Sequence, residues 1–405
     1  MGTGYAKNGP LCQWRAFFSL PHCPSICRPK APYPLHRSSK GYSYPMSRLP
    51  LSTFFCALLL ALPVGAKNYN VLMLGNSYTA QTWTQVRDFF AADPDNSITL
   101  TRITPGGQQL LQHNSTASTS NLITNGGPWD IVVLQDQSQT PAFAAVFSGW
   151  WDTFYTAGAK PLTERAQAAG AQVLFFQTWA RAAGDTNTLQ YFNNDPLQMQ
   201  DALTSSYGTA ADLHNAAVAP VGEAWEDSLI ANPGLALHSG DKSHPSTAGA
   251  FLTGAVFYET ITGRDARTNS HTGGLAVGNA TLLKSTAHYV FYKEWATSHP
   301  TLANTSPTAD PDNDDVTNED EWLGGTSPTA GNDRFHAELH EKGASLEVHY
   351  PSSPDRVYTV ETRTALNSQW NASAAIIGSG TLQTRTIPSP VPGSWIRVRS
   401  TRPAM

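Results

Sequence analysis

Residues 71–81 read VLMLGNSYTAQ, so four apolar residues lead directly into a Gly-Asn-Ser turn and then into a helical pattern. A short, continuous apolar run that ends at a turn is typical of a strand buried on both faces. If the strand ends before Gly75 and Asn76, Ser77 lies at its carboxyl end, where a helix begins. Two interpretations are open at this point: Ser77 caps the helix, or it is a nucleophile at the tip of the strand.

The same alternation of apolar runs and helical patterns continues to about residue 300. Continuous apolar strands separated by helices indicate a parallel sheet covered on both faces. We therefore predict an α/β fold with a doubly wound, parallel five-stranded sheet, in which ligands bind at the carboxyl ends of the strands. The predicted strands are 69–74, 97–103, 131–135, 171–177 and 216–221. The predicted helices are 80–91, 143–169 (either one helix or two that break near Gly158), 195–214, 222–231, 245–262 and 280–298.

The first 66 residues have the composition of a leader rather than of a folded domain. Residues 46–66 combine a short basic start, an apolar run and small residues, which is typical of a secretory signal peptide. The apolar run is too short to span a bilayer, so we expect no stable membrane insertion once the signal is removed. Residues 1–45 contain no acid and no periodicity, and are interpreted as a disordered leader or an over-extended start before Met46. These features predict a secreted or periplasmic bacterial protein.

Charge and cysteine usage exclude several classes of protein. Seven of the 26 Lys and Arg lie in residues 1–66, which hold no Asp or Glu, so residues 67–405 carry 19 bases against 31 acids, a net charge of −12. Such an acidic chain argues against nucleic acid or an anionic membrane as the partner. All four cysteines also lie before residue 67, so the remainder has no disulfide, no thiolate zinc site and no cysteine nucleophile.

Beyond residue 300 the composition changes, and residues 301–333 form a polar, acidic stretch rich in Pro, Gly and Thr, as a linker does. Oxygen-bearing residues within it follow the spacing of positions 1, 3, 5, 9 and 12 of an EF-hand-type calcium loop, with a backbone carbonyl at position 7. These candidate calcium ligands are Asp310, Asp312, Asp314, Val316 (through its carbonyl), Asn318 and Glu321. Position 6 is Asp315, where calcium loops normally have Gly. The alternative is a solvated acidic linker. The stretch resembles the calcium-binding linkers of thrombospondin type 3 kind, which implies a structural calcium ion.

Residues 334–405 contain short alternating runs separated by Pro, Ser and Gly turns. This pattern predicts a small all-β domain, sandwich-like in architecture. Trp370 and Trp395 are expected in its core rather than on a sugar-binding surface, because aromatic side chains favour burial.

A second polar segment lies at the far end of the α/β region, where residues 237–249 read LHSGDKSHPSTAG. Asp241 and His244 lie three residues apart in a predicted loop, so the carboxylate can orient the imidazole as a base for Ser77. Two other interpretations are a solvent-exposed histidine before a capped helix, and a metal site made by His238, Asp241 and His244.

Donors for a negatively charged oxygen are present after the second and third predicted strands. ITPGGQQLLQH places Gly106 and Gly107 where backbone can approach a ligand closely. PWDIVVLQDQSQ ends the third strand in a cluster of amides that includes Gln135 and Gln137. A side-chain amide there could donate to a tetrahedral oxyanion beside backbone N–H groups.

Taken together, GNSYT, the Gly-Gly loop, VVLQDQS and DKSHP resemble the four sequence blocks of the SGNH (GDSL-like) hydrolases. The resemblance covers about residues 68–263, and is closest to a bacterial branch that has GNSYT in place of GDS. It implies a flavodoxin-like SGNH hydrolase domain over 67–300, with Ser77 as nucleophile, His244 as base and acid, and Asp241 as the group that orients it.

The same resemblance implies an oxyanion hole made by the backbone N–H groups of Ser77 and Gly107 (or Gly106). The third block of the family usually supplies an Asn in Gly-x-Asn-Asp, whereas this chain has glutamines there. Gln137 is the predicted amide donor and Gln135 is the alternative.

The predicted function is an exported serine esterase that forms an acyl-enzyme and needs no cofactor for catalysis. Its expected substrate is a small-molecule or polysaccharide ester, with an acetyl or other short acyl group on a polysaccharide preferred. The alternatives are a non-catalytic protein that binds a glycan or a cell-surface ligand, and a lipase or thioesterase with the same triad. Further residues expected near the cleft are His113, Trp179, Arg181, Glu223 and Trp225.

Overall fold

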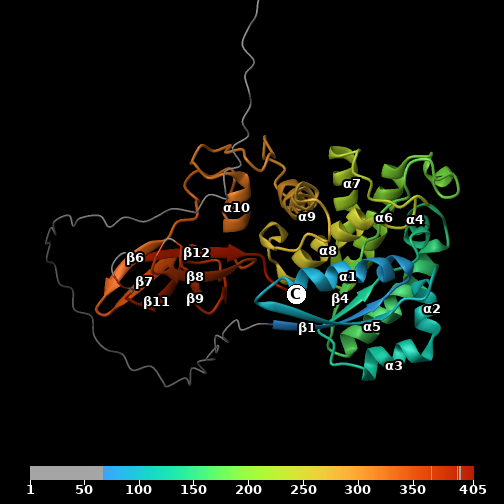
Figure 1. The fold of residues 1–405 in the computed structure, drawn as a ribbon, viewed down its shortest axis with the longest axis horizontal. Helices are drawn as coiled ribbons and strands as arrows, with labels where there is room; N and C mark the ends of the chain where they lie inside the picture. The colour runs from blue at the N-terminus through green and yellow to red at the C-terminus, as the bar shows by residue number, and fades with distance from the viewer. Residues whose placement is uncertain (1–66, 366, 390, 392–393) are drawn as a thin grey trace, which may run out of the picture.

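The computed structural model describes residues 67–365, 367–389, 391 and 394–405. The leader predicted at 1–45 and the signal peptide predicted at 46–66 lie outside these residues. Figure 1 shows an α/β domain that begins with β1 and, beside it, a smaller β-domain formed by the C-terminal strands.

The centre of the α/β domain is a five-stranded sheet of order β2-β1-β3-β4-β5, and every neighbouring pair in it is parallel. This confirms the predicted fold class. The strands of this sheet are β1 (Lys67–Leu74), β2 (Asn96–Ile103), β3 (Ile131–Leu134), β4 (Gln172–Phe176) and β5 (Ala217–Ala219).

Helices cover both faces of this sheet. Successive residues of each strand point to opposite sides, so each face of the sheet carries its own apolar core. In β1, Val71 and Met73 belong to one apolar core, and Leu72 and Leu74 belong to the other. The first core is closed by α1 (Ser77–Ala91), α7 (Val221–Ala231), α8 (Thr247–Thr262) and α9 (Val277–Thr297). The second is closed by α2 (Leu110–Ser115), α3 (Ala117–Asn125), α4 (Gln139–Val146), α5 (Lys160–Ala168) and α6 (Pro196–Asp212).

The prediction for 143–169, one helix or two that break near Gly158, is wrong in its detail. The chain forms α4, then a π-helix η1 (Asp152–Ala159) that leads directly into α5. The break comes at Gly149, whose φ of 85° lies in the left-handed region that favours glycine, and not at Gly158. Gly158 instead lies inside the π-helix, where an added Cβ would come within 2.9 Å of the backbone N of Leu111.

The sequence prediction also missed several short helices. Two of them, α2 and α3, follow the Gly-Gly loop after β2. Two short 3₁₀ helices, η2 (Leu189–Phe192) and η3 (Ala266–Thr268), occur in connections. The fifth, α10 (Asn318–Gly324), lies in the acidic linker. All are seven residues or shorter except α3, so hydrophobic periodicity carries little signal for them.

The C-terminal domain consists of two antiparallel sheets that share one small apolar core. One sheet has the order β10-β8-β12 with β9 paired to β8, and the other has the order β11-β7-β6. These strands are β6 (Glu338–Lys342), β7 (Ser345–Tyr350), β8 (Val357–Arg363), β9 (Asn371–Ala372), β10 (Ile376–Ile377), β11 (Gln383–Pro388) and β12 (Trp395–Thr401).

The prediction that Trp370 and Trp395 lie in this core is wrong. Both rings are half-buried and lie against guanidinium groups: Arg363 is 4.4 Å from the Trp370 ring centroid and 5.6 Å from that of Trp395, and Arg397 is 4.1 Å from that of Trp370. An indole face that stacks on a cation is stable without full burial.

The linker and the chain end join the two domains. Trp322 of α10 packs into the core of the α/β domain, while its carbonyl accepts a hydrogen bond of 2.9 Å from Nε of Arg356 in the β-domain. The backbone N–H of Met405 donates to the carbonyl of Ile261 at 3.0 Å. Gly263 ends α8 with a φ of 67°, and an added Cβ there would lie 2.3 Å from the carbonyl oxygen of Arg402.

Among the helices of the described residues, none has the length and apolar character to cross a membrane.

Candidate active site

The first polar segment places Ser77 at the start of α1, with two residues between it and the end of β1. The helix is capped by Asn76, whose Oδ1 accepts from the backbone N–H of Tyr78 at 3.1 Å. The interpretation of Ser77 as the helix cap is therefore wrong. Because the neighbouring asparagine performs the capping, the hydroxyl of Ser77 is available for another partner.

The turn before Ser77 is held from several directions. The backbone N–H of Asn76 donates to Oε1 of Gln135 at 2.9 Å, and the same oxygen accepts from Oγ1 of Thr79 at 2.9 Å. An added Cβ at Gly75 would lie 2.5 Å from that Gln135 oxygen, so glycine is required by close approach. Nε2 of His113 lies 2.8 Å from the carbonyl oxygen of Gly75.

His113 therefore has a different position from the one expected. It is fully buried under the turn instead of lining the cleft. Burial lowers its pKa, although the hydrogen bond to Gly75 opposes that shift. A neutral imidazole that donates from Nε2 fits this environment, and its role is to hold the turn in place.

Ser77, His244 and Asp241 come together from the two ends of the α/β domain. Nε2 of His244 lies 2.9 Å from Oγ of Ser77, and Nδ1 of His244 lies 2.5 Å from Oδ2 of Asp241. The imidazole bridges the hydroxyl and the carboxylate, which is the connectivity that a Ser-His-Asp triad requires. The side chains of His244 and Asp241 are 32% and 49% exposed, so a substrate and water can reach them.

The carboxylate of Asp241 is held in its charged state. Its Oδ1 accepts from the backbone N–H groups of Ser243 at 3.0 Å and His244 at 2.9 Å, and from the Ser239 hydroxyl at 2.8 Å. Partial burial acts to raise the pKa of Asp241, but the hydrogen bonds from His244 and its neighbours outweigh burial and lower it well below the usual range. An ionised Asp241 fixes the tautomer of His244 with the proton on Nδ1.

The metal-site interpretation of this loop finds no support in the geometry. Nε2 of His238 lies 2.9 Å from the carbonyl oxygen of Ala180, and both ring nitrogens of His244 already have partners. Among the described residues, the groups of three acidic or histidine side chains close enough to share a metal ion lie elsewhere and include neither histidine.

The Gly-Gly loop lies between β2 and α2. Both glycines are exposed, and Gly107 has a φ of 69° with open space where a Cβ would be. The loop is tied to the nucleophile turn because Nδ2 of Asn76 donates to the carbonyl of Gln108 at 3.0 Å. The assignment of Gly107, or Gly106, as an oxyanion donor stays a prediction.

The two glutamines after β3 have separate roles. Gln135 is buried, its Oε1 holds the nucleophile turn, and its Nε2 donates to the carbonyl of Asp136. Both ends of its amide are therefore engaged inside the protein. Gln137 is half-buried, and its Nε2 donates to Oε1 of Gln139 at 2.8 Å. Of the two candidates, only Gln137 can turn its amide toward a ligand without breaking the turn before Ser77.

An aromatic stack lies beside the triad, and the sequence prediction gave Tyr78 no role in it. The rings of Tyr78 and Trp179 stack with centroids 4.5 Å apart, and those of Trp179 and Trp225 stack at 3.9 Å. The Tyr78 ring is edge-on to the His244 imidazole at 5.4 Å. Tyr78 lies in the GNSYT segment, directly after Ser77, and this position could have indicated that it is part of the site.

Glu223, another residue expected near the cleft, accepts a hydrogen bond of 2.9 Å from Nε2 of Gln177.

The acidic linker gathers oxygen atoms that have no protein partner. Asp310, Asp312 and Asp314 bring carboxylate oxygens within 4.8 Å of one another. Glu321 is 0% exposed, and neither of its carboxylate oxygens has a hydrogen-bond partner in the described residues. Burial raises its pKa to about 8, and the charges of Asp312, Asp314, Asp310 and Asp333 act in the same direction. Oxygen ligands without partners at this density fit a Ca²⁺ ion.

Two details of the linker go beyond the sequence prediction. Asp315 replaces the usual glycine, and it adopts that residue's left-handed conformation with a φ of 67°, which Asp tolerates better than most residues. Asp333 was missed, although a repeat could have revealed it: TSPTA occurs at 305–309 and again at 326–330, and Asp333 stands in the second copy where Asp312 stands in the first. Oδ1 of Asn318 also lacks a hydrogen-bond partner among the described residues, and the assignment of the Val316 carbonyl as a ligand stays a prediction.

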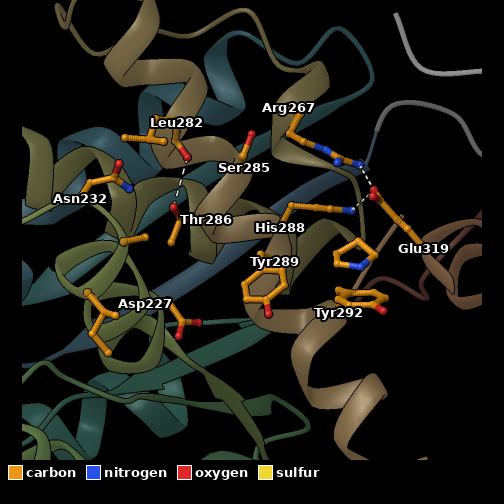
Figure 2. A pocket seen from close by; sticks show the side chains of 13 residues that line it. Asp227, Asn232, Arg267, Leu282, Ser285, Thr286, His288, Tyr289, Tyr292 and Glu319 are labelled. Atoms are coloured by element: carbon orange, nitrogen blue, oxygen red, sulfur yellow. Dashed lines mark hydrogen bonds and ion pairs between the residues drawn. The ribbon is translucent and has the colours of Figure 1, made fainter. Parts of the chain in front are cut away.

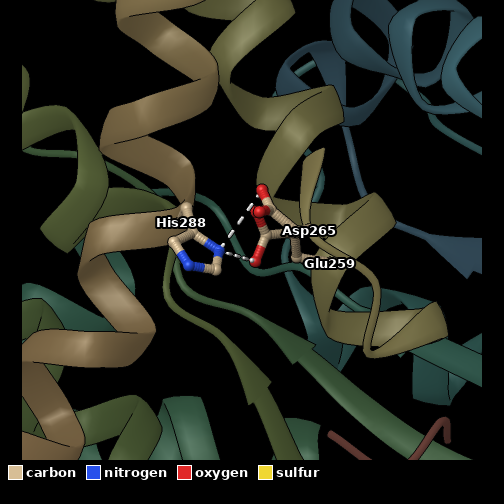
Figure 3. A group of neighbouring side chains, drawn as sticks. All are labelled: Glu259, Asp265 and His288. Atoms are coloured by element: carbon tan, nitrogen blue, oxygen red, sulfur yellow. Dashed lines mark hydrogen bonds and ion pairs between the residues drawn. The ribbon is translucent and has the colours of Figure 1, made fainter. Parts of the chain in front are cut away.

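A second charged group lies between α8, η3 and α9 (Figure 3), where Glu259, Asp265 and His288 meet. Arginines already neutralise its carboxylates: Arg402 lies 3.2 Å from Glu259, and Arg267 lies 2.8 Å from Asp265. We therefore interpret this group as a network of ion pairs rather than as a metal site.

A cavity of about 500 Å³ adjoins the same network. Figure 2 shows its lining, which includes Asp227, Tyr289 and Tyr292 and ends at the ion pair between Arg267 and Glu319. None of its lining residues belongs to the Ser77–His244–Asp241 group, so this cavity is not the cleft of the candidate active site.

The fold and the site define an α/β protein with a doubly wound parallel sheet and a Ser-His-Asp group at the carboxyl edge of that sheet. No family model matches the chain, and no curated protein matches it. A DUF4886 family protein from Bacteroides uniformis is similar in structure at 16% identity, over 55% of this chain and 95% of that one, with a TM-score of 0.49.

Two further solved structures are similar over about half of the chain. A protein from Slackia heliotrinireducens, described as "a putative SGNH hydrolase", is 28% identical over 48% of this chain and 98% of its own, with a TM-score of 0.39. Axe2, an acetylxylan esterase from Geobacillus stearothermophilus, is 13% identical over 49% of this chain and 95% of its own, with a TM-score of 0.38.

Proposed function

We propose that this chain is an exported serine esterase of SGNH type that hydrolyses carboxylic esters through an acyl-enzyme. One observation carries the proposal: Ser77 Oγ, both ring nitrogens of His244 and Oδ2 of Asp241 form a continuous chain with separations of 2.9 and 2.5 Å. A hydroxyl, an imidazole and a carboxylate in this order make a nucleophile, its base and the group that orients the base.

In the acylation step, Ser77 Oγ attacks the ester carbonyl carbon while Nε2 of His244 takes the hydroxyl proton. The imidazolium that forms is stabilised by the carboxylate of Asp241, whose hydrogen bonds keep it ionised. The tetrahedral intermediate then collapses, the bond to the alcohol oxygen breaks, and His244 returns its proton to that oxygen. The alcohol leaves, and Ser77 carries the acyl group.

Deacylation uses the same groups in the same order. A water molecule gives a proton to Nε2 of His244 and attacks the acyl carbon. The second tetrahedral intermediate then collapses, the bond between Ser77 Oγ and the acyl carbon breaks, and His244 returns its proton to Oγ, so that the carboxylic acid leaves and the Ser77 hydroxyl is restored. The positive end of α1 and the backbone N–H of Ser77 favour the negative oxygen that forms in both steps. Gly107 and Gln137 are the proposed additional donors.

For the substrate, we propose an acetyl or other short acyl ester on a polysaccharide, met by the protein after export. Three indirect observations favour this class: the signal-like residues 46–66, the acidic composition of residues 67–405, and the β-domain joined to the α/β domain through α10. The exposure of His244 and Asp241 is compatible with a bulky alcohol that remains in solvent.

A fluorophosphonate probe and a short aryl ester test the esterase proposal together. We expect the probe to label Ser77, and 4-nitrophenyl acetate to be hydrolysed. Ser77→Ala and His244→Ala should lower kcat by at least about 10³-fold without unfolding the protein. Ser298→Ala removes an exposed hydroxyl at the end of α9 and serves as the matched control. If Ser77→Ala hydrolysed the ester as fast as the unmodified protein, the proposal would be wrong, and glycan binding without labelling would favour the non-catalytic alternative.

We also propose that the acidic linker binds one structural Ca²⁺. Asp310, Asp312, Asp314, Asn318 and Glu321 would supply side-chain oxygens, with Val316 as the carbonyl ligand and Asp333 as an additional acid. The ion would supply positive charge to carboxylates that otherwise repel one another, and would take no part in ester hydrolysis. The buried, unpartnered oxygens of Glu321 are the observation that favours it.

A further inference from the structure

Arg181 is a buried cation that has no carboxylate partner in the described part of the chain. Its side chain lies in the loop after β4, and the residue is 9% exposed. Nη1 donates to the Tyr78 hydroxyl at 2.7 Å, whereas Nε is buried and has no hydrogen-bond partner among the residues that the structure describes. Within the described residues, no Asp or Glu oxygen lies within ion-pair distance of it. Burying an unpaired charge is costly, so its occurrence here requires a reason.

A comparison with Arg356 shows how unusual this is. These two are the arginines with less than a tenth of their surface exposed among the residues that the structure describes. Arg356 pairs with the Asp355 carboxylate at 2.7 Å and donates from Nε to the carbonyl of Trp322 at 2.9 Å. Its charge is therefore compensated within the protein. Among the described residues, the guanidinium of Arg181 has only Tyr78: the neutral hydroxyl accepts its hydrogen bond, and the ring centroid lies 5.8 Å from Cζ.

The loop that carries Arg181 is fastened to the loop that carries His244. The backbone N–H of Ala182 donates to the carbonyl of Lys242 at 3.0 Å, and Nζ of Lys242 donates to the carbonyl of Gly184 at 2.7 Å. The indole N–H of Trp179 donates to the carbonyl of Ser243, next to His244, at 2.9 Å. Contacts on both sides of Arg181 thus hold its backbone against the loop that supplies the catalytic base.

The guanidinium also reaches the nucleophile side of the site through Tyr78. That tyrosine follows Ser77, its ring is edge-on to His244, and its hydroxyl lies 2.9 Å from Oγ of Ser243. Arg181 therefore contacts a residue that touches both the start of α1 and the His244 loop. The positive charge of Arg181 also acts on His238: burial lowers the pKa of His238, and the charge of Arg181 acts in the same direction.

We propose that Arg181 binds a carboxylate of the substrate, so that the enzyme prefers esters carrying a negative charge near the scissile bond. This inference rests on the proposed esterase function and adds the substrate class. An ion pair with a substrate carboxylate would supply the compensation that Arg181 lacks within the protein. The carboxylate can come from the alcohol side, as in an O-acetylated acidic sugar, or from the acyl side, as in the half-ester of a dicarboxylic acid.

Matched pairs of esters distinguish the two sources. Phenyl acetate and 4-acetoxybenzoate differ by a carboxylate on the leaving alcohol, and 4-nitrophenyl pentanoate and 4-nitrophenyl hemisuccinate differ by a carboxylate on the acyl chain. For one of the pairs we expect kcat/KM to be at least about tenfold higher for the charged member. The pair that shows this preference identifies the side from which the carboxylate comes.

Variants of Arg181 then test whether that residue carries the preference. Arg181→Met should lower kcat/KM for the charged ester about 10- to 100-fold and change the neutral ester less than about threefold. Arg181→Lys keeps the charge and should lie between the two. Arg87→Met, which removes an exposed arginine of α1, is the matched control and should change neither member. Thermal unfolding of each variant verifies that it is folded.

Two outcomes would overturn the proposal. Equal losses on the charged and neutral esters in Arg181→Met would mean that the residue only positions Tyr78. No preference for a charged member in either pair would remove the proposal by itself, even if Arg181→Met failed to fold. Either result would leave the esterase function intact as long as the neutral esters are hydrolysed in a Ser77-dependent reaction, so the two proposals fail separately.

Discussion

Oδ1 of Asp136 accepts a hydrogen bond of 3.1 Å from the backbone N–H of Leu110, the first residue of α2. The same oxygen accepts from the backbone N–H of Gln137 at 2.6 Å. One buried carboxyl group therefore joins the segment that follows the Gly-Gly loop to the segment that carries the proposed amide donor. Burial raises its pKa to about 8, although both hydrogen bonds oppose that shift, and its Oδ2 has no hydrogen-bond partner in the described part of the chain.

We predict that Asp136→Asn changes how stability depends on pH. A carboxyl with a pKa near 8 in the folded state and near 4 in the unfolded state keeps its proton only in the folded state between these values. The free energy of unfolding should therefore fall as the pH rises from about 4 to about 8, by at most about 1.4 kcal/mol per pH unit. The side-chain amide of asparagine does not titrate in this range. The free energy of unfolding of Asp136→Asn should therefore rise relative to that of the unmodified protein as the pH increases from about 4 to about 8.

Urea unfolding at pH 5 and pH 8 measures the difference in the free energy of unfolding between Asp136→Asn and the unmodified protein. The contributions of the other titratable groups are the same in both proteins and cancel in this difference. Asp136→Ala also abolishes the hydrogen bonds to Leu110 and Gln137, and should be less stable than Asp136→Asn at both values. A stability difference between Asp136→Asn and the unmodified protein that does not change with pH would mean that Asp136 is ionised in the folded state.

The parts of the site that sequence could predict are those in which a single short segment carries both the chemistry and its position. Ser77 follows a continuous apolar strand, and Asp241 and His244 lie three residues apart before a helix start. Because ligands bind at the shared carboxyl edge of a parallel sheet, we could expect Ser77 to lie close to Asp241 and His244 there. The three central strands β1, β3 and β4 were found for the same reason, since a strand buried on both faces is an uninterrupted apolar run.

What could not be predicted depends on contacts between distant residues. Gln135 and Gln137 both follow the same strand in sequence, and the hydrogen bond that Oε1 of Gln135 accepts from the backbone N–H of Asn76, 59 residues away, separates their roles. Asn76 and Ser77 are both good capping residues, so their competition is decided by which oxygen reaches the backbone N–H of Tyr78. The unpaired charge of Arg181 is likewise a property of what is absent around it in space, and no local pattern reports that.

For the acidic linker, we predict that calcium binding releases a proton near neutral pH. The pKa of Glu321 is raised to about 8 without the ion, so this carboxyl is protonated at pH 7 and must lose its proton to bind Ca²⁺. Calcium affinity should therefore increase from pH 6 to pH 8. Isothermal titration calorimetry at pH 7 in buffers of different ionisation enthalpy should detect about one released proton.

Substitutions in the linker test which acids bind the ion. Glu321→Gln should weaken calcium binding at least about tenfold, Asp333→Asn should weaken it less, and Glu338→Gln, on the exposed strand β6, should have no effect. Chelation should lower the Tm of the unmodified protein and leave that of Glu321→Gln almost unchanged. A Tm that is insensitive to both calcium and chelator would contradict the structural-ion proposal.

A further prediction concerns the network that joins α9 to the linker helix. His288 lies 3.2 Å from Glu259 of α8 and 3.4 Å from Glu319 of α10. Burial opposes the charged imidazole, but Glu259, Glu319 and Asp265 outweigh burial and raise its pKa to about 9. Burial likewise opposes ionisation of Glu319, whose pKa is nevertheless lowered to about 2 by His288 and Arg267.

The two shifts define a pH window for this network. A raised histidine pKa stabilises the fold fully below about 6.5, and the contribution disappears as the pH rises through about 9. A lowered carboxyl pKa contributes above about 4.5, and the contribution disappears as the pH falls through about 2. The stability advantage of the unmodified protein over His288→Gln should therefore be largest between about pH 4.5 and 6.5, on the order of 1–3 kcal/mol, and should shrink by pH 9. Urea unfolding at pH 5.5 and pH 9 measures it, and an advantage that grew toward pH 9 would mean that His288 is neutral in the folded protein.

The last prediction separates the two glutamines after β3 by what each substitution should change. Gln137 has its amide engaged only with Gln139, so Gln137→Ala should leave the free energy of unfolding within about 0.5 kcal/mol and lower kcat about 10²- to 10³-fold if its amide stabilises the oxyanion. Gln135→Ala removes a buried amide that holds Asn76 and Thr79, and should lower the free energy of unfolding by about 2–4 kcal/mol. Gln139→Ala frees the Gln137 amide from its present partner and should leave kcat within a few-fold. Steady-state kinetics with 4-nitrophenyl acetate and urea unfolding of the three variants decide the matter. If Gln137→Ala kept full kcat, the oxyanion would have to be held by backbone N–H groups alone, because the amide of Gln135 cannot turn toward the site without releasing the turn that positions Ser77.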